Sequence, residues 1–178
     1  MATGAARNAR LFFGLPLDGA LDAHAQALIP ALVDEAQGRA VPIGNLHATL
    51  AFLGSMPVDA IPALREIGAA VPRTALRLQL DRAGSFRAAR VAWLGMDVVP
   101  DPLMALHAAL CTRLEAAGMR VEERPYQPHV TIARHCARAL PARTIAPIPW
   151  GVQRVVLYES VTAPQGPVYT PRLEWALE

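Results

Sequence analysis

The sequence contains one short pattern twice: a histidine followed two positions later by a threonine, inside an apolar segment. The pattern occurs at His47 and Thr49, and again at His129 and Thr131. Successive side chains of a β-strand point to opposite faces, so each histidine shares a face with its threonine while apolar residues occupy the other face. The two segments are therefore predicted to be half-buried strands, each presenting one imidazole and one hydroxyl on its polar face.

The elements predicted around the two patterns also follow the same order. A strand at residues 11–15, a helix and the first His-x-Thr strand are followed later by a strand at residues 91–96, a helix beginning at Asp101 and the second His-x-Thr strand. This repetition indicates an internal duplication. The predicted fold is α+β, with two pseudo-symmetric lobes whose antiparallel sheets are flanked by helices and with an active-site cleft between the sheets.

At this length, residues 1–178 are predicted to form a single two-lobed domain, with residues 1–9 as a loose tail. Asp18 is predicted to cap the first helix, and Pro30 is predicted to kink or split it. Phe52 is predicted to lie on the core face of the first His-x-Thr strand.

Composition excludes several classes of protein. A hydrophobic fraction of 53% is typical of a folded domain, and a net charge of +2 gives no broad basic surface for long duplex DNA. All 17 basic residues are arginine, which suits bidentate contacts to phosphate. The two cysteines lack the spacing of a metal site or of a disulfide framework. No secretory segment and no apolar run long enough to span a membrane is found, so a cytoplasmic protein is expected.

Two histidines and two threonines on equivalent strands suit acid–base cleavage of a phosphodiester. One histidine can remove a proton from water while the other protonates the leaving oxygen, and the hydroxyls can donate hydrogen bonds to the nonbridging oxygens. This chemistry requires no metal and no cofactor. Two alternatives are weaker: a threonine nucleophile activated by its histidine, and a two-histidine metal site, which lacks a neighbouring carboxylate or cysteine.

At these motifs the chain resembles the two-histidine (2H) phosphoesterase superfamily, and within it the RNA 2',3'-cyclic phosphodiesterases, also called 2'-5' RNA ligases. The resemblance covers segments 10–15, 45–54, 91–95 and 128–134 and the closing segments 157–160 and 166–169. It implies hydrolysis of RNA 2',3'-cyclic phosphate ends to 2'-phosphomonoesters, with 2'-5' ligation as the reverse chemistry. It also implies His47 as general acid and His129 as general base.

Other residues are expected to complete the site. Thr49 and Thr131 are expected to bind the substrate phosphate through their hydroxyls, and the resemblance implies the same role for Arg134. Arg134 stands five residues after His129, so it reaches the cleft only if the strand ends or bulges near Ala133. Phe12 and Phe13 are candidates for stacking on a base, although alternation places one of the two in the core.

Two further functions remain open on the sequence. The same cleft could belong to a module that binds RNA ends or nucleotides without turnover, or the same chemistry could act on another cyclic or 2'-5' phosphodiester. The expected partner is an RNA with a 2',3'-cyclic phosphate end or a cyclic nucleotide. A self-contained two-lobed core favours a monomer.

Overall fold

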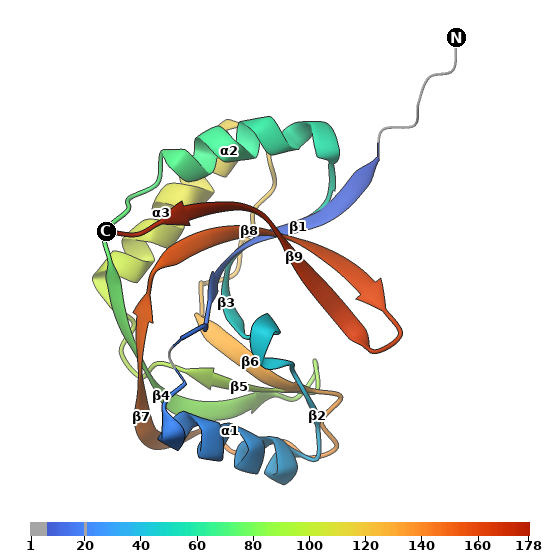
Figure 1. Cartoon of the computed structure of the whole chain (residues 1–178), viewed down its shortest axis with the longest axis vertical. Helices are drawn as coiled ribbons and strands as arrows, with labels where there is room; N and C mark the ends of the chain where they lie inside the picture. Colours follow the sequence, from blue (N-terminus) through green and yellow to red (C-terminus); the bar gives the residue numbers. More distant parts are fainter. Residues whose placement is uncertain (1–6, 20) are drawn as a thin grey trace.

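The computed structural model describes residues 7–19 and 21–178 (Figure 1). The strands are β1 (Asn8–Pro16), β2 (Arg39–Ala40), β3 (His47–Pro57), β4 (Leu76–Phe86), β5 (Val91–Gly95), β6 (His129–Arg134), β7 (Arg143–Val152), β8 (Arg154–Ala163) and β9 (Gly166–Ala176). The helices are α1 (Ala23–Ala36), α2 (Ile61–Ala69) and α3 (Asp101–Ala116), with short 3-10 turns η1 (Ile43–Asn45) and η2 (Val58–Ala60). The predicted α+β class is confirmed.

The strands form one antiparallel sheet in the order β7-β4-β5-β6-β3-β1-β8-β9, with β2 paired to β6. The sheet divides into two related halves, β6-β5-β4-β7 and β3-β1-β8-β9, each led by a His-x-Thr strand. The prediction of separate sheets is corrected in one respect. The halves are joined edge to edge at a single pair, Ala48 with Val130, because both motif strands are the inner edges of their halves.

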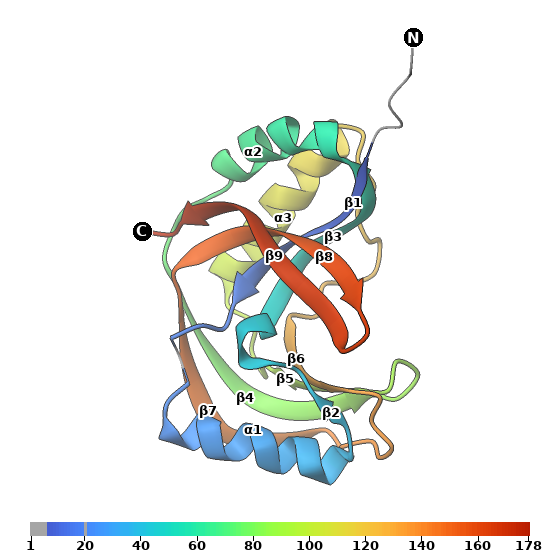
Figure 2. The same ribbon diagram turned by 45° about the vertical axis from the view of Figure 1, so that its right-hand side comes forward.

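Each duplicated helix packs on the half of the sheet that does not contain its preceding strand. Helix α1 follows β1 but contacts β2, β5 and β6, whereas α3 follows β5 and contacts β3 and α2. Figures 1 and 2 show α1 beneath β4, β5 and β7, with α2 and α3 at the opposite end of the molecule. A continuous core, containing Phe13, Leu94 and Trp150, includes residues of both halves. This exchange of helices locks the two halves together and fixes the motif strands relative to each other.

Helix α1 differs from the sequence prediction at its N-cap and is not split at Pro30. Asp22, not Asp18, is the N-cap, and its Oδ1 accepts a 2.8 Å hydrogen bond from the Ala25 amide. Asp18 instead pairs with Arg154 of β8. Pro30 lies inside one continuous helix rather than between two.

The prediction of a loose tail is wrong for Asn8 and Ala9. Asn8 and Ala9 belong to β1, where they pair with Pro57 and Met56, and Ala9 is only 4% exposed. Residues 1–6 lie outside the described residues. Among the described helices, none has the length and apolarity needed to span a membrane.

Candidate active site

The pairing of Ala48 with Val130 brings the two motifs together. Because β3 and β6 are antiparallel, extending this register by one residue on either side places His47 opposite Thr131 and Thr49 opposite His129. Both Ala48 and Val130 are fully buried, so the four polar side chains lie on the opposite face of the sheet. The histidines and threonines therefore form a compact four-residue group with approximate twofold symmetry.

Both histidines have the same tautomer. Nδ1 of His47 lies 2.7 Å from the carbonyl oxygen of Asn45, and Nδ1 of His129 lies 2.7 Å from the carbonyl oxygen of Gln127. A carbonyl can only accept a hydrogen bond, so Nδ1 carries the proton in each neutral ring. Nε2 of each neutral imidazole is left as the nitrogen that can accept a proton.

Burial favours the neutral form of both imidazoles. It lowers the pKa of His47 from 6.5 to about 4, and although the hydrogen bond to Asn45 opposes this change, the charges of Arg134 and His129 add to it. Burial is also the main cause that lowers the pKa of His129, and Arg134 contributes again. Since Arg134 affects both histidines, one guanidinium supplies positive charge to the whole group.

Thr49 contacts His47 directly. Its hydroxyl donates a 3.2 Å hydrogen bond to Nε2 of His47. Sequence reasoning ranked a threonine nucleophile low because side chains two positions apart on a strand face a common ligand rather than each other. The observed contact shows that this argument from spacing is wrong for the first motif. No such hydrogen bond joins Thr131 and His129 among the described residues.

A β-bulge places Arg134 on the face that carries the histidines. Ala92 pairs with Ala133 and Trp93 pairs with Thr131, so Ile132 is the extra residue in β6. Ile132 and Ala133 are both fully buried, and the alternation resumes one residue out of step at Arg134. The bulge required by the sequence prediction is therefore present. Arg134 Nη2 also donates a 3.4 Å hydrogen bond to the Tyr169 hydroxyl.

The same bulge occurs in β3 and corrects the prediction for Phe52. Phe13 pairs with Ala51 and Gly14 pairs with Thr49, which leaves Leu50 as the extra residue. Phe52 is consequently 42% exposed, on the face that carries His47, instead of packed in the core. Phe52 and Arg134 are therefore equivalent positions in the two motifs.

Aromatic rings surround His47. The Phe12 ring lies 4.9 Å from the imidazole, and the Tyr169 ring meets it edge-on at 5.1 Å. Tyr158 stacks on Phe12 at 5.1 Å. Phe12 is only 3% exposed, so it supports the imidazole and offers no free face to a base. The prediction for Phe13 is wrong, since this ring is fully buried and stacks on Trp175.

The other half contributes Phe86 and Trp93 beside His129. The rings of Phe86 and His129 pack edge to face, with their centroids 4.9 Å apart. The centroid of the Phe86 ring lies 5.5 Å from that of Trp93. Trp93 Nε1 is buried and has no hydrogen-bond partner among the described residues. Sequence reasoning missed these two rings as well as Tyr158 and Tyr169. Alternation along β5 could have placed Trp93, but the pairing of β4 with β5 is not encoded locally.

Tyr126 and Asn45 support the first motif. The Tyr126 hydroxyl donates a 3.2 Å hydrogen bond to the backbone carbonyl of Thr49, and its ring stacks on His107 of α3 at 3.9 Å. The side chain of Asn45 donates to the Pro167 carbonyl at 2.9 Å, which ties the start of β3 to the β8–β9 hairpin. These contacts hold the backbone of the motif from both ends.

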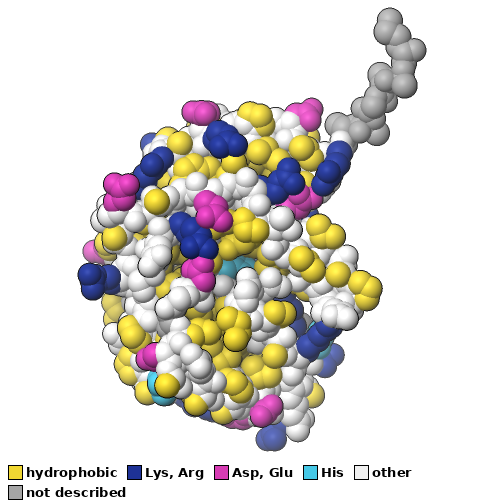
Figure 3. All heavy atoms as spheres, viewed as in Figure 1, with side chains coloured by type: hydrophobic (Ala, Val, Ile, Leu, Met, Phe, Trp, Pro, Cys, Tyr) yellow, Lys and Arg dark blue, Asp and Glu magenta, His cyan; other side chains and the backbone are white. Residues whose placement is uncertain are grey.

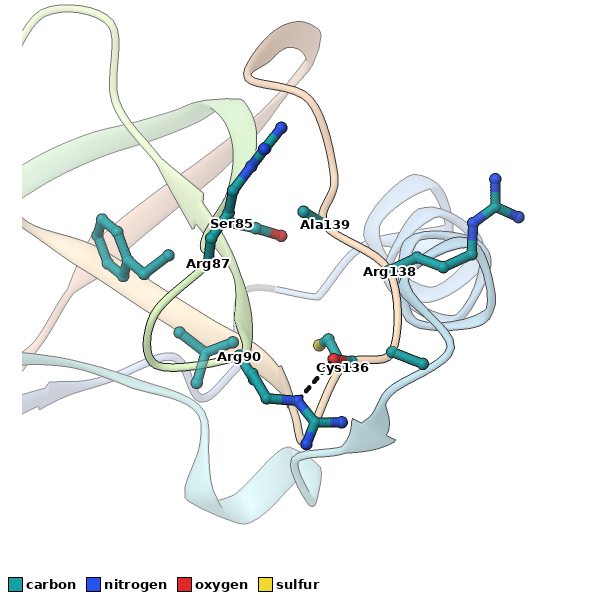
Figure 4. A pocket seen from close by; sticks show the side chains of 9 residues that line it. Ser85, Arg87, Arg90, Cys136, Arg138 and Ala139 are labelled. Atoms are coloured by element: carbon teal, nitrogen blue, oxygen red, sulfur yellow. Dashed lines mark hydrogen bonds between the residues drawn. The ribbon is translucent and has the colours of Figure 1, made fainter.

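Histidine surface is visible at the centre of the view in Figure 3, between the two halves, and acidic and basic side chains are interspersed over this face. A hollow of about 230 Å³ lies next to Phe86 and is framed by Arg87, Arg90 and Arg138 (Figure 4). Arg90 donates to the carbonyls of Cys136 and His135, at 3.1 and 3.4 Å, so its guanidinium is used to hold this loop.

A second hollow, of about 50 Å³, is lined in part by Arg39, Arg134 and Tyr169. No group of three or more His, Cys, Asp or Glu side chains with the arrangement of a metal site occurs within residues 7–19 and 21–178. Cys111 and Cys136 are both free thiols, Cys136 buried and Cys111 partly exposed.

Relatives of the chain are known. The RNA 2',3'-cyclic phosphodiesterase of Escherichia coli is 36% identical over 144 residues, which cover 79% of this chain and 80% of that protein. The enzyme of the same name from Thermotoga maritima is 28% identical and covers 95% of this chain and 96% of its own length.

Solved structures share the fold. Escherichia coli LigT complexed with 3'-AMP has a TM-score of 0.82 at 31% identity, with 96% of this chain and 99% of that chain covered. TT0787 of Thermus thermophilus has a TM-score of 0.73 at 26% identity, with 94% and 97% covered. The family model of the 2'-5' RNA ligase superfamily matches residues 20–163. The chain belongs to the 2'-5' RNA ligase superfamily.

Proposed function

We propose that this protein is an RNA 2',3'-cyclic phosphodiesterase that hydrolyses 2',3'-cyclic phosphate ends to 2'-phosphomonoesters. The observation that carries the proposal is the antiparallel pairing of the two motifs, which gathers two imidazoles of identical tautomer and two hydroxyls on one face. Several relatives bear the name of this activity, at up to 36% identity. The proposal takes the protein to be a cytoplasmic monomer whose partner is RNA.

In this reaction water attacks phosphorus and the bond from phosphorus to the 3' oxygen breaks, so the phosphate remains on the 2' oxygen. His129 accepts the proton of the attacking water at Nε2, and His47 delivers a proton to the 3' oxygen. Thr49 and Thr131 donate hydrogen bonds to the nonbridging oxygens, and Arg134 offsets the charge that develops there. Attack by the 5' hydroxyl of a second RNA in place of water would instead form a 2'-5' linkage.

The assignment of His47 as the general acid requires the bound substrate to raise the pKa of this imidazole. With a pKa of about 4 in the substrate-free protein, His47 is neutral at pH 7 and cannot donate from Nε2. An anionic phosphate held between the motifs raises the pKa of both imidazoles, because it favours the charged form. The acid must therefore acquire its proton together with the substrate.

The reaction is tested by incubating the protein, in EDTA, with 2',3'-cyclic mononucleotides and with a short RNA that ends in a cyclic phosphate. The expected product is the 2'-phosphate, separated chromatographically from the 3' isomer. His47→Ala and His129→Ala should be inactive, whereas His24→Ala, at an exposed histidine of α1, should retain the full rate. Binding without product would refute hydrolysis and favour the RNA-end binding module.

The order of acid and base is tested with a cyclic substrate whose 3' bridging oxygen is replaced by sulfur. A thiolate leaves without protonation, so the variant that lacks the general acid should recover much of its rate on this substrate. Recovery by His47→Ala is expected. Recovery by His129→Ala alone would reverse the two assignments.

A further inference from the structure

The hollow beside Phe86 lies next to the histidine that the proposed mechanism assigns to activate the nucleophile. Phe86 lines this hollow of about 230 Å³, and its ring packs edge to face on His129 at 4.9 Å. Because Phe86 is only half-buried, it presents surface to the hollow while it contacts the imidazole. A group that enters the hollow at Phe86 is therefore separated from the imidazole of His129 by one ring.

The internal symmetry of the sheet shows why this position is open. Counting two residues beyond the row that contains the motif threonine gives Phe86 in β4 and its counterpart Tyr158 in β8. In the first half, β8 continues to Ala163, and Tyr169 of β9 lies beside the Tyr158 ring, with the centroids 6.3 Å apart. In the second half, β4 ends at Phe86 and β7 pairs with it only as far as Ala83. The space that a hairpin fills in one half is left as a hollow in the other.

The rim of the hollow is cationic and largely unengaged. Arg87 and Arg138 are exposed, and neither takes part in any of the ion pairs found among the described residues. They come from the β4–β5 turn and from the loop after β6, on opposite sides of the hollow (Figure 4). No Asp or Glu is among the described residues that line it. Two free guanidiniums without a competing carboxylate favour a phosphate group.

The chemistry indicates what should enter from this side. In an in-line displacement the attacking and leaving oxygens lie on opposite sides of phosphorus. His47 serves the leaving 3' oxygen, so the nucleophile approaches from the side of His129. Water carries nothing beyond its own oxygen, whereas the 5' hydroxyl of an RNA carries a nucleoside and then a phosphate. A site beyond His129 for a base and an anion therefore suits the second of these nucleophiles.

We propose that the hollow binds the 5'-hydroxyl end of a second RNA, with its first nucleoside beside Phe86 and its first phosphate between Arg87 and Arg138. The proposal rests on the proposed function, because it uses the same catalytic group. The 5' oxygen forms a bond to phosphorus while the bond from phosphorus to the 3' oxygen breaks. The proton of the 5' hydroxyl passes to His129, and the 3' oxygen takes a proton from His47. Since the cyclic ester is the activated donor, the step consumes no other reactant.

The test measures joining and hydrolysis in one mixture, with a donor RNA that has a cyclic end and with either of two acceptors, a deoxynucleoside or its 3'-phosphate. The wild type should join the phosphate-bearing acceptor about 10- to 100-fold more efficiently, as expected for hydrogen bonds to a charged group. Arg87→Gln and Arg138→Gln should each reduce this preference at least about threefold. Joining of the plain deoxynucleoside and hydrolysis of a cyclic mononucleotide should not change.

Arg77→Gln is the matched control, since Arg77 is an exposed arginine near the other end of β4. Equal joining of the two acceptors by the wild type, or a preference that both variants retain, would overturn the site. Hydrolysis without joining at millimolar acceptor would overturn it as well. A wild type that neither hydrolyses nor joins would refute the proposed function. Fluorescence anisotropy of a 3'-labelled RNA with a 5' hydroxyl then decides the site, which requires weaker binding by both variants but not by Arg77→Gln.

Discussion

The low pKa of His47 makes the stability of the fold depend on pH in a defined direction. In the unfolded chain the imidazole has a pKa near 6.5, whereas in the folded protein it is about 4. As pH falls below 6.5 the unfolded state binds a proton that the native state rejects, so stability is lost progressively down to about pH 4. A shift of this size corresponds to about 3 kcal/mol in full, of which about 2–3 kcal/mol is already lost at pH 4.5.

The perturbation that isolates this effect is His47→Asn, because the asparagine amide cannot titrate and can still donate toward the Asn45 carbonyl. Urea unfolding of the variant and the wild type at pH 7 and pH 4.5 gives the stability difference at each pH. That difference should move by about 2–3 kcal/mol in favour of the variant at the lower pH. Carboxylates and His129 titrate in both proteins and cancel. The exposed His24→Asn serves as the control, and a difference that stays constant between the two pH values would refute the reasoning.

Three further predictions concern single side chains. Arg134→Gln should reduce kcat/KM for the cyclic substrate about 10²- to 10³-fold with an unchanged Tm. A loss below about threefold would contradict a role for Arg134 in phosphate binding. Gly14→Ala places a Cβ 3.3 Å from Cδ2 of His47 and should displace the imidazole, so kcat should fall about tenfold while the circular dichroism spectrum stays unchanged. A wild-type kcat would show that the imidazole accommodates the methyl group without losing its catalytic position. Glu159→Gln removes ion pairs of 3.2 and 3.0 Å to two arginines and should cost about 1–3 kcal/mol in urea unfolding without altering KM; wild-type stability would contradict this.

Much of this architecture follows from local patterns in the sequence. Alternation predicts that His47 and Thr49 share a polar face while Ala48 is buried, and the structure confirms both. The repeated order of strand, helix and motif strand indicates an internal duplication. The pairing of Ala48 with Val130 places the two motif strands side by side in the structure. These features are predictable because they depend on neighbours within a few residues.

Features that depend on the partner strand could not be predicted in the same way. The positions of Phe52 and Arg134 are set by bulges defined against β1 and β5, and strict alternation places both on the wrong face. From the sequence, a bulge near Ala133 was only the condition under which Arg134 would reach the cleft, and Phe52 was predicted to lie in the core. The N-cap was misassigned to Asp18 because both aspartates precede the apolar stripe of α1. In the structure Asp22 accepts the hydrogen bond from the Ala25 amide, whereas Asp18 pairs with the distant Arg154.

The most direct test of the central claim is a kinetic comparison of the wild type, His47→Ala, His129→Ala and the double variant on one 2',3'-cyclic nucleotide, with folding verified for each. The account predicts that each single variant loses about 10²- to 10⁴-fold in kcat. The double variant should lose far less than the product of the two single losses, because the imidazoles act on one phosphate as a unit. Near-full activity in either single variant would contradict a mechanism in which the paired motifs share the proton transfers.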